Sequence, residues 1–409
     1  MKSLHGYLAF LSTLLLAAAS LQAQTWVTQT SGVTEALNSV YFVDQSNGYI
    51  VGNNGSVFKT TDGGAHWVSV LSTQQLFSVH FTDVNTGYAV GNSGTIIKTT
   101  NGGANWTTQT SNTYFTLNGV GCASASVCFA VGAVRTSITN LSSPTALVTT
   151  TNGGATWTVQ ANGLANKFLY AVDFADANNG YAVGDSGSIL KTTNSGTSWT
   201  PQTSGTTFKL TSVKAVNASV AYAVGYNATT LIPVALKTTN GGTTWAQLTT
   251  NIPTLGLFDG VSFSDANNGY ISSSNYVLKT TDGGSTWINT ANPTGVSTLS
   301  IFTPSTGLVY AVGNNGTILK SGTSTAISFS PSSANRVEVG KNGILRYSLA
   351  QSVNVRIVVS DANGKLTQVM NASKSAGNYS QPLFNEKNLG VRFVDFRAGN
   401  QHQILKFFR

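Results

Sequence analysis

The sequence predicts an all-β protein: a seven-bladed β-propeller followed by a small immunoglobulin-like β-sandwich. Three observations support this fold class. A segment ending in tryptophan recurs with spacings of 39, 51, 42, 46 and 42 residues, and periods near 40 residues with several short strands are typical of propellers. Charged residues make up only 9% of the 409 residues, against about 25% in typical soluble domains. The repeat stops near residue 325, where a different strand pattern begins.

The recurring segment, here called the bracket, has the form Thr-x-Asp/Asn-x-Gly-x-x-Trp and first occurs as TTDGGAHW at residues 60–67. Its glycine-rich turn suits a hairpin that needs positive φ, and a buried tryptophan contributes roughly 4–6 kcal/mol as an upper bound. Six copies around a ring cannot converge on one substrate, so we expect a structural role. The six acid or amide positions and their tryptophans are Asp62 and Trp67, Asn101 and Trp106, Asn152 and Trp157, Asn194 and Trp199, Asn240 and Trp245, and Asp282 and Trp287.

A second element, of the GYAVG type, occurs seven times, so there are seven units but only six brackets. The last unit ends at GTILKS (316–321) without a tryptophan, whereas an extra TWVTQTSG begins at Thr25. The strand around Trp26 is therefore predicted to complete the last unit, which closes the ring without an exposed sheet edge. The predicted propeller covers residues 24–325. Each unit has four strands, which in the first unit are expected at 37–43, 48–52, 56–61 and 67–71.

The bracket resembles the Asp-box, or bacterial neuraminidase repeat, of sialidases, xyloglucanases, sortilins and photosystem II assembly and stability factors. With its GYAVG strands and KTTDGG turns, the segment 25–325 most resembles the last of these families. The resemblance implies a seven-bladed propeller that binds a partner rather than catalyses a reaction. Sialidase chemistry, as the resemblance describes it, needs three arginines around the substrate, whereas the propeller has only Arg135.

An extracellular glycoside hydrolase of the Asp-box type is the alternative function. Such an enzyme needs two carboxylates about 5–10 Å apart. Most acids of the propeller occupy repeated turns, and those that do not are Glu35, Asp173, Asp185 and Asp259. No catalytic residue is assigned, and Asp173 and Asp259 are the acids whose substitution would test the alternative.

Neither a cofactor nor a metal ion is expected. The propeller histidines, His66 in a bracket and His80 in an inner strand, have no partners at the spacing of a metal site. Residues 25–325 contain ten basic and ten acidic side chains, so the propeller has no charge pattern for nucleic acid. Residues 326–409 contain eleven basic and four acidic side chains.

The first 23 residues have the layout of a secretory signal peptide: one lysine, an apolar core from Leu8 to Ala19, and small residues before a cleavage site after Ala23. No later run reaches the roughly 18 apolar residues of a transmembrane helix. Cys122 and Cys128 face each other across one predicted hairpin. In an exported protein this spacing favours a disulfide, and two buried thiols are the alternative.

The segment 326–409 contains about seven short strands, which suits a small immunoglobulin-like sandwich. In order and turns it resembles the C-terminal sorting domain of type IX secretion cargo, which implies contact with export machinery and a place on the cell surface or outside the cell. A carbohydrate-binding or spacer sandwich is the alternative.

We expect the binding face at the end of the propeller formed by the loops between units and the turns between the second and third strands. These loops vary, include insertions at 133–146 and 226–235, and carry aromatic rings suited to a protein, peptide or glycan. The prediction centres on the third to fifth units. Its candidate residues are Tyr114, Phe115, Arg135, Phe168, Tyr170, Phe208, Tyr226 and Phe258.

Overall fold

The computed structural model describes residues 25–70, 74–133, 145–160 and 167–322, together with 337–339, 344–349, 353–361, 366–375, 377–382, 391–398 and 401–408. The predicted signal peptide, Arg135 and most of the insertion at 133–146 lie outside these residues. The chain divides into two compact units, residues 1–325 and 326–409. Each unit is described by itself.

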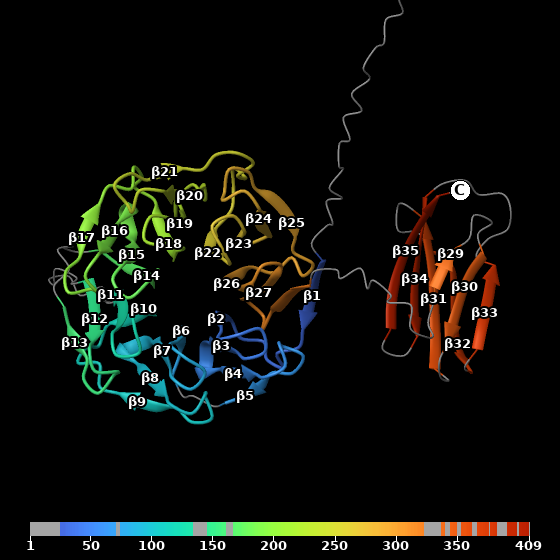
Figure 1. The fold of residues 1–409 in the computed structure, drawn as a ribbon, viewed down its shortest axis with the longest axis horizontal. Helices are drawn as coiled ribbons and strands as arrows, with labels where there is room; N and C mark the ends of the chain where they lie inside the picture. Colours follow the sequence, from blue (N-terminus) through green and yellow to red (C-terminus); the bar gives the residue numbers. More distant parts are fainter. Residues whose placement is uncertain are drawn as a thin grey trace, which may run out of the picture. The chain divides into compact units, whose positions relative to one another are not determined.

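Within its described residues, the first unit contains seven four-stranded antiparallel sheets, or blades, arranged in a ring (Figure 1). The strands of each blade are called A to D from the inside outward. The seven-bladed all-β propeller predicted from the sequence is therefore confirmed. Blades 1 and 2 consist of β2 (Leu37–Phe42), β3 (Gly48–Gly52), β4 (Val57–Thr60) and β5 (Val68–Ser69), then β6 (Leu76–Phe81), β7 (Gly87–Gly91), β8 (Ile96–Thr99) and β9 (Thr107–Gln109).

The next four blades follow the same order. They consist of β10 (Thr116–Cys122), β11 (Cys128–Ala133), β12 (Thr145–Thr150) and β13 (Thr158–Val159); β14 (Leu169–Phe174), β15 (Gly180–Gly184), β16 (Ile189–Thr192) and β17 (Thr200–Gln202); β18 (Lys209–Ala215), β19 (Ala221–Tyr226), β20 (Pro233–Thr238) and β21 (Ala246–Gln247); and β22 (Phe258–Phe263), β23 (Gly269–Ser273), β24 (Tyr276–Thr280) and β25 (Ile288–Ala291). Short 3-10 turns join strands B and C at η1 (Asn53–Gly55), η2 (Asn92–Gly94) and η3 (Asp185–Gly187).

Blade 7 is built from both ends of the unit. It consists of β26 (Thr298–Ser305), β27 (Leu308–Gly313), β28 (Ile318–Gly322) and, as its outer strand, β1 (Thr25–Gln29). In the antiparallel pair β1–β28, Trp26 lies opposite Ser321. The N-terminal strand thus occupies the place that the missing seventh bracket leaves open.

The outer strands are shorter than the sequence suggests. In blade 1 the D strand is Val68–Ser69 rather than 67–71. The reason is that the Trp67 ring packs against the core cluster of blades 7 and 1 instead of continuing the ladder, while Val68 and Ser69 are exposed. Burial on both faces is most complete in the second strand of the blade, as in β3, where all five residues are buried.

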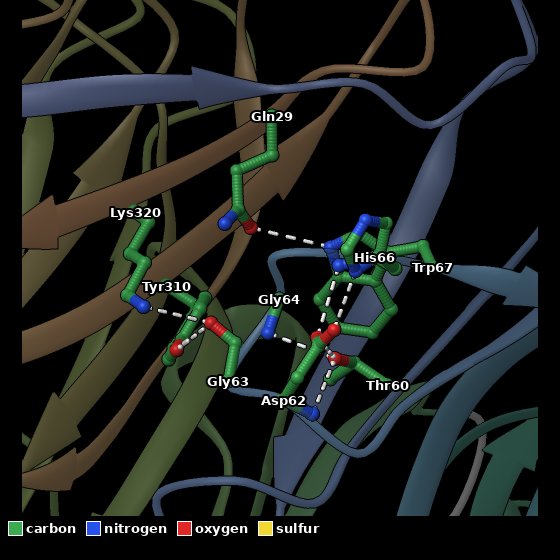
Figure 2. Close-up of polar contacts among 9 residues, drawn as sticks. All are labelled: Gln29, Thr60, Asp62, Gly63, Gly64, His66, Trp67, Tyr310 and Lys320. Carbon is green, nitrogen blue, oxygen red and sulfur yellow. Dashed lines mark hydrogen bonds and ion pairs between the residues drawn. The ribbon is translucent and has the colours of Figure 1, made fainter. Parts of the chain in front are cut away.

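Each bracket is a closed network of hydrogen bonds around its turn (Figure 2). In blade 1, the Thr60 hydroxyl donates to Asp62 over 2.8 Å and accepts from the Gly64 N–H over 2.8 Å. The Asp62 carboxylate also accepts from the backbone N–H of His66 over 2.9 Å. The two glycines of the turn, Gly63 and Gly64, have φ of 64° and 80°, a region where other residues are strained. The structural role predicted for the bracket follows from this network.

The hydrophobic core lies between neighbouring blades rather than within one blade. One cluster joins Tyr88 and Val90 of blade 2 to Leu117, Val120 and Trp157 of blade 3. Burial of these faces against each other fixes the rotation from blade to blade. The inner ends of the strands are thereby held around a common axis, which positions the residues that face the channel.

A stacked pair of rings recurs at these junctions. The ring of Phe81 stacks on Tyr49 with centroids 3.8 Å apart, and it also covers Gly87, where a Cβ would lie 2.6 Å from the ring. In blade 3 the phenylalanine and the glycine are replaced by Cys122 and Cys128, which are cross-strand partners joined by a disulfide. The disulfide occupies the place that a phenylalanine ring fills in blades 1, 2, 4 and 6.

The second unit contains two antiparallel sheets among its described residues. One has the order β29 (Val337–Val339), β30 (Ile344–Leu349) and β33 (Gly377–Pro382). The other has the order β32 (Leu366–Lys374), β31 (Val353–Asp361), β34 (Val391–Ala398) and β35 (Gln401–Phe408). These seven strands match the number expected from the sequence. Among the residues described in either unit, the structure contains no helix that is long and apolar enough to cross a membrane.

Candidate functional site

Every A strand contains a β-bulge at its second or third residue. The ladder between strands A and B skips this residue in all seven blades, as at Asn38 between Leu37 and Ser39. A bulge re-aims the side chain that it carries. The bulged residues, here called the bulge ring, are Asn38, Phe77, Asn118, Tyr170, Thr211, Asp259 and Leu299.

The bulge ring surrounds the entrance of the central channel. All seven members line one cavity of 350 Å³, and they lie at the start of the A strands, next to the loops that join successive blades. Below them, serines hold the blades together: the hydroxyl oxygen of Ser39 accepts from the N–H of Val79 over 3.3 Å, and that of Ser212 accepts from Val261 over 3.2 Å. The channel wall below the entrance is therefore largely occupied with structural bonds.

Three members of the bulge ring have the same structural role. Asn38, Asn118 and Thr211 each donate a hydrogen bond to the carbonyl oxygen that begins the next A strand, at Leu76, Leu169 and Phe258, over 2.7, 3.0 and 2.6 Å. The other four members are Phe77, Tyr170, Asp259 and Leu299. Chemical variety at the entrance is thus concentrated in these four positions.

A cluster of aromatic and charged side chains surrounds the entrance at blades 4 to 6. Here called the entrance cluster, it comprises Phe168, Tyr170, Lys209, Tyr226 and Asp259. The Phe168 and Tyr170 rings stack with centroids 6.5 Å apart. The ammonium of Lys209 lies 4.0 Å from the Tyr170 centroid and 5.6 Å from the Tyr226 centroid, which is the geometry of a cation–π contact.

The carboxyl of Asp259 is half-buried in this cluster. Burial raises its pKa to about 7, and the positive charge of Lys209 opposes that rise. Burial, followed by the charges of Asp259 and Asp185, also raises the pKa of Tyr226. A carboxyl that titrates near neutral pH at the mouth of a cavity marks a candidate site for a ligand.

Asp173, at the other end of the channel, has hydrogen-bond donors around its carboxylate. Asp173 accepts hydrogen bonds from Lys214 over 2.9 Å and from the Ala215 N–H over 2.8 Å. It lies three residues further along its strand than Tyr170, the counterpart of Asp259, so the two acids differ in depth by about 10 Å. Asp173 and Asp259 line the same cavity, with a difference in depth at the upper limit of the carboxylate separation that the hydrolase alternative requires.

His80 also lies at that end. Burial lowers its pKa to about 4, and its ring contacts Tyr41 with centroids 4.9 Å apart. The other histidine of the propeller, His66, pairs with Asp62 over 2.6 Å within a bracket. Among the described residues, no three His, Cys, Asp or Glu side chains group as a metal site would require.

The remaining acids singled out in the sequence belong to turns. Glu35 accepts a 2.7 Å hydrogen bond from Ser56, which lowers the pKa of its carboxyl. Asp185 begins η3, where Asn53 and Asn92 begin η1 and η2. The "DANNG" acids act in the same way: Asp44 accepts from the N–H groups of Ser46 and Asn47 over 2.7 and 2.8 Å.

The predicted binding residues differ in their surroundings. Phe168, Tyr170 and Tyr226 belong to the entrance cluster, and Tyr114 is 92% exposed. Phe258 is wrong as a binding candidate, because it precedes the bulge and is 0% exposed in the core of blades 5 and 6.

Two further candidates are partly core residues. Phe115 packs against the core of blades 2 and 3, and Phe208 packs against that of blades 4 and 5. Phe208 also lines a wider hollow of 680 Å³ with Lys167. Polar groups in that hollow are used by its turns, since the Ser204 hydroxyl donates to the Thr206 carbonyl over 3.1 Å.

Lys209 and three exposed apolar residues of the same face were not predicted from the sequence. Leu231, Ile232 and Leu255 are 48%, 42% and 64% exposed, and the Gly256 N–H donates to the Leu231 carbonyl over 2.9 Å. The cluster and these residues together shift the centre of the face from blades 3 to 5 toward blades 4 to 6. The insertion at 226–235, which contains Leu231 and Ile232, was the available signal.

The closed ring of seven blades with Asp-box brackets defines the protein as a seven-bladed Asp-box propeller. A family model described as photosynthesis system II assembly factor YCF48 matches residues 18–158 and 155–406. The chain belongs to this family. Comparison with curated proteins found no match.

Solved structures resemble the chain in fold. A structure described as YCF48 bound to D1 peptide has a TM-score of 0.57 at 17% identity and covers 74% of this chain and 97% of its own. YCF48 from Cyanidioschyzon merolae has a TM-score of 0.55 at 17% identity, with coverage of 73% and 98%. An ancestral GH74 enzyme has a TM-score of 0.59 at 16% identity, with coverage of 92% and 60%.

Proposed function

We propose that this protein is a non-enzymatic assembly propeller that binds a protein or peptide partner through the channel entrance at blades 4 to 6. The observation that carries the proposal is the entrance cluster. In three of the seven bulges the side chain donates a hydrogen bond to the next blade. Tyr170 and Asp259 instead present an aromatic ring and a carboxyl group to the cavity. Aromatic anchors at a concave site supply most of the energy of many interfaces.

The family supports a protein partner over a glycan. Its description names an assembly factor, and a relative of the same fold has a peptide bound. The exposed apolar side chains Leu231, Ile232 and Leu255 lie on the same face and would extend the contact beyond the cavity.

Capture of a partner by the full chain tests this function. Wild-type protein is used as bait, and captured proteins are identified by mass spectrometry. The double variant Tyr170→Ala with Tyr226→Ala should lose the partner that the wild type retains. Val84→Ala is the matched control, since Val84 is an exposed apolar residue of an A–B turn at the opposite end. Loss with the control but not with the double variant would assign the function to the other face.

We also propose export, with placement on the cell surface or outside the cell. The signal-peptide pattern of residues 1–23 supports it, as does the Cys122–Cys128 disulfide, because disulfides persist in oxidising compartments. We assign the segment 326–409 as an immunoglobulin-like sorting domain for type IX secretion. Fusion of this segment to a periplasmic reporter in a host with that system tests the assignment, and a reporter retained in the periplasm would contradict it.

Hydrolysis remains a direct test of the alternative. A panel of extracellular glycans is incubated with the full chain, and released sugars are measured. Activity that is lost with both Asp259→Asn and Asp173→Asn would favour an enzyme over a binding protein. The separation of these two acids in depth leads us to expect no such activity.

A further inference from the structure

The carboxylate of Asp259 has fewer bonding partners than the side chains at equivalent positions. Asn38, Asn118 and Thr211 occupy equivalent bulges and each donate a hydrogen bond to the next blade. An ionised carboxylate cannot donate, so Asp259 can have that role only in its protonated form. Among the described residues, no hydrogen bond reaches its oxygen atoms, and the charged group that faces it is Lys209. A half-buried acid without a hydrogen-bond donor is destabilised until a partner supplies one.

The wall beside Asp259 already accommodates a cation. Tyr170 carries the Lys209 ammonium at 4.0 Å from its ring centroid, and Tyr226 is the second ring within reach at 5.6 Å. Rings of this kind attract ammonium and guanidinium groups through their negative faces. Among the described residues of the entrance cluster, the group that lacks a hydrogen-bond donor is the Asp259 carboxylate. A negatively charged group of this kind favours a cationic ligand over an anionic one.

The space suits one side chain. The cavity of 350 Å³ is near the lower end of the range for small-ligand sites, and it continues past the serine level of the A strands to Tyr41, His80 and Asp173. A basic side chain can reach in from a partner seated on the face above, with its apolar stem against Leu299 and Phe77.

We propose that the channel entrance takes a lysine or arginine side chain of the partner protein, whose cation lies against Tyr170 and pairs with the Asp259 carboxylate. This inference rests on the proposed function, because it specifies the anchor residue of the partner. Binding requires the ionised carboxylate, so protons compete with the cation. The groups that face Asp259 from the neighbouring elements are Lys209 of β18 and Tyr226 of β19, and Asp185 of η3 acts on Tyr226.

The test uses the full chain and four capped tripeptides, acetyl-Ala-X-Ala-amide with X as Lys, Arg, Gln or Glu, in calorimetric titrations at pH 8. The Lys or Arg peptide should bind at least tenfold more tightly than the Gln peptide, and the Glu peptide should bind most weakly. Lowering the pH from 8 to 6 should weaken the binding of the cationic peptides and leave the affinity for the Gln peptide unchanged. Methylammonium is titrated in the same way, to test whether the site binds a small free amine.

Three variants make the test specific. Asp259→Asn should remove the preference for cations. Lys209→Met keeps an unbranched apolar side chain and removes the competing positive charge. It should increase the affinity for the Lys peptide several-fold. Asp185→Asn is the matched control, since asparagine is the native residue at the same place in η1 and η2, and it should change affinity less than twofold.

Several outcomes would overturn the inference: no cationic peptide bound at millimolar concentration, equal binding of the Gln or Glu peptide, or full binding by Asp259→Asn. Methylammonium binding as tightly as the Lys peptide would assign the site to a small amine instead. Failure here is distinguishable from failure of the proposed function. If partner capture is lost with Tyr170→Ala and Tyr226→Ala but kept by Asp259→Asn, the partner binds at the entrance without a basic anchor.

Discussion

The hydroxyl of Tyr310 donates a 2.7 Å hydrogen bond to the carbonyl oxygen of Gly63, which joins two residues 247 positions apart in the chain. Lys320 donates to the same oxygen over 2.7 Å. This junction is the seam at which blade 7 meets blade 1 (Figure 2). An interior junction has the same form, since Tyr222 and Lys237 donate to the Gly283 carbonyl over 2.9 and 2.6 Å. The seam is therefore closed by the same bond set that joins consecutive blades.

Removing both donors at the seam should destabilise the propeller. Tyr310→Phe with Lys320→Met leaves the Gly63 carbonyl without these partners, which should lower the free energy of unfolding by about 1–3 kcal/mol. Urea unfolding followed by tryptophan fluorescence measures this, because all seven tryptophans belong to the propeller. Tyr222→Phe with Lys237→Met is the matched interior control and should cost a similar amount. A seam variant with wild-type stability would contradict the bracket as a stabilising contact.

Deleting residues 24–31 should have a larger effect than either double variant. The deletion removes β1, and with it five residue pairs with β28 and the 3.2 Å hydrogen bond from the Trp67 indole to Gln29. It also exposes the edge of β28, which favours association between chains. We expect a sharply lower melting temperature and concentration-dependent aggregation. A deletion variant that melts like the wild type would mean that the ring does not depend on its closing strand.

Closure of the ring could be predicted from the sequence because it leaves one bracket fewer than the number of units. Six brackets in seven units, with a spare strand around Trp26, allow one arrangement in which every blade has four strands. The lengths of the outer strands could not be predicted. The Trp67 ring packs inward against residues of blade 7, which are distant in the sequence.

The site was less accessible to sequence reasoning than the fold. The face was predicted from variable loops, but the side chains that reach the channel are set by a bulge near the start of each A strand. Phe258 precedes that bulge and points into the core, whereas Asp259 occupies it and points into the channel. Lys209 resembled an ordinary strand lysine, and only the approach of β14 to β18 brings it over Tyr170.

The disulfide of blade 3 should be replaceable by the pair of residues used elsewhere in the ring. Cys122→Phe with Cys128→Gly restores the phenylalanine and glycine found at Phe81 and Gly87, and the new ring should stack on Tyr88 as Phe81 stacks on Tyr49. We expect a melting temperature close to that of the oxidised wild type. Reductant should lower the melting temperature of the wild type and leave the variant unchanged.

The serine variant is the control for this exchange. Cys122→Ser with Cys128→Ser removes the bond without supplying a ring, and should lower the free energy of unfolding by about 2 kcal/mol. A phenylalanine–glycine variant no more stable than the serine variant would show that the space at this junction differs from that in the other blades.

Two aromatic residues of blade 3 should differ in their effect on stability. Trp157 is 0% exposed in the core between blades 2 and 3, whereas Tyr114 is 92% exposed. Trp157→Ala should lower the free energy of unfolding by about 3–5 kcal/mol, and Tyr114→Ala should change it by less than about 0.5 kcal/mol. Calorimetric melting distinguishes the two. Equal losses would place Tyr114 in a packed environment and remove it from the binding candidates.

Substitution of Asp259 should change stability in a pH-dependent way. Burial raises the pKa of this carboxyl to about 7, above the value of about 3.9 in unfolded chains. Between pH 4 and pH 7 the folded state therefore binds more protons than the unfolded state, so the wild type loses stability as the pH rises through this window. Asp259→Asn keeps the shape without the charge. It should be more stable than the wild type by about 1–2 kcal/mol at pH 8, after allowance for partial exposure to solvent, and the difference should disappear near pH 4. An Asp259→Asn variant that is less stable than the wild type at pH 8 would mean that the ionised carboxylate has a partner within the protein.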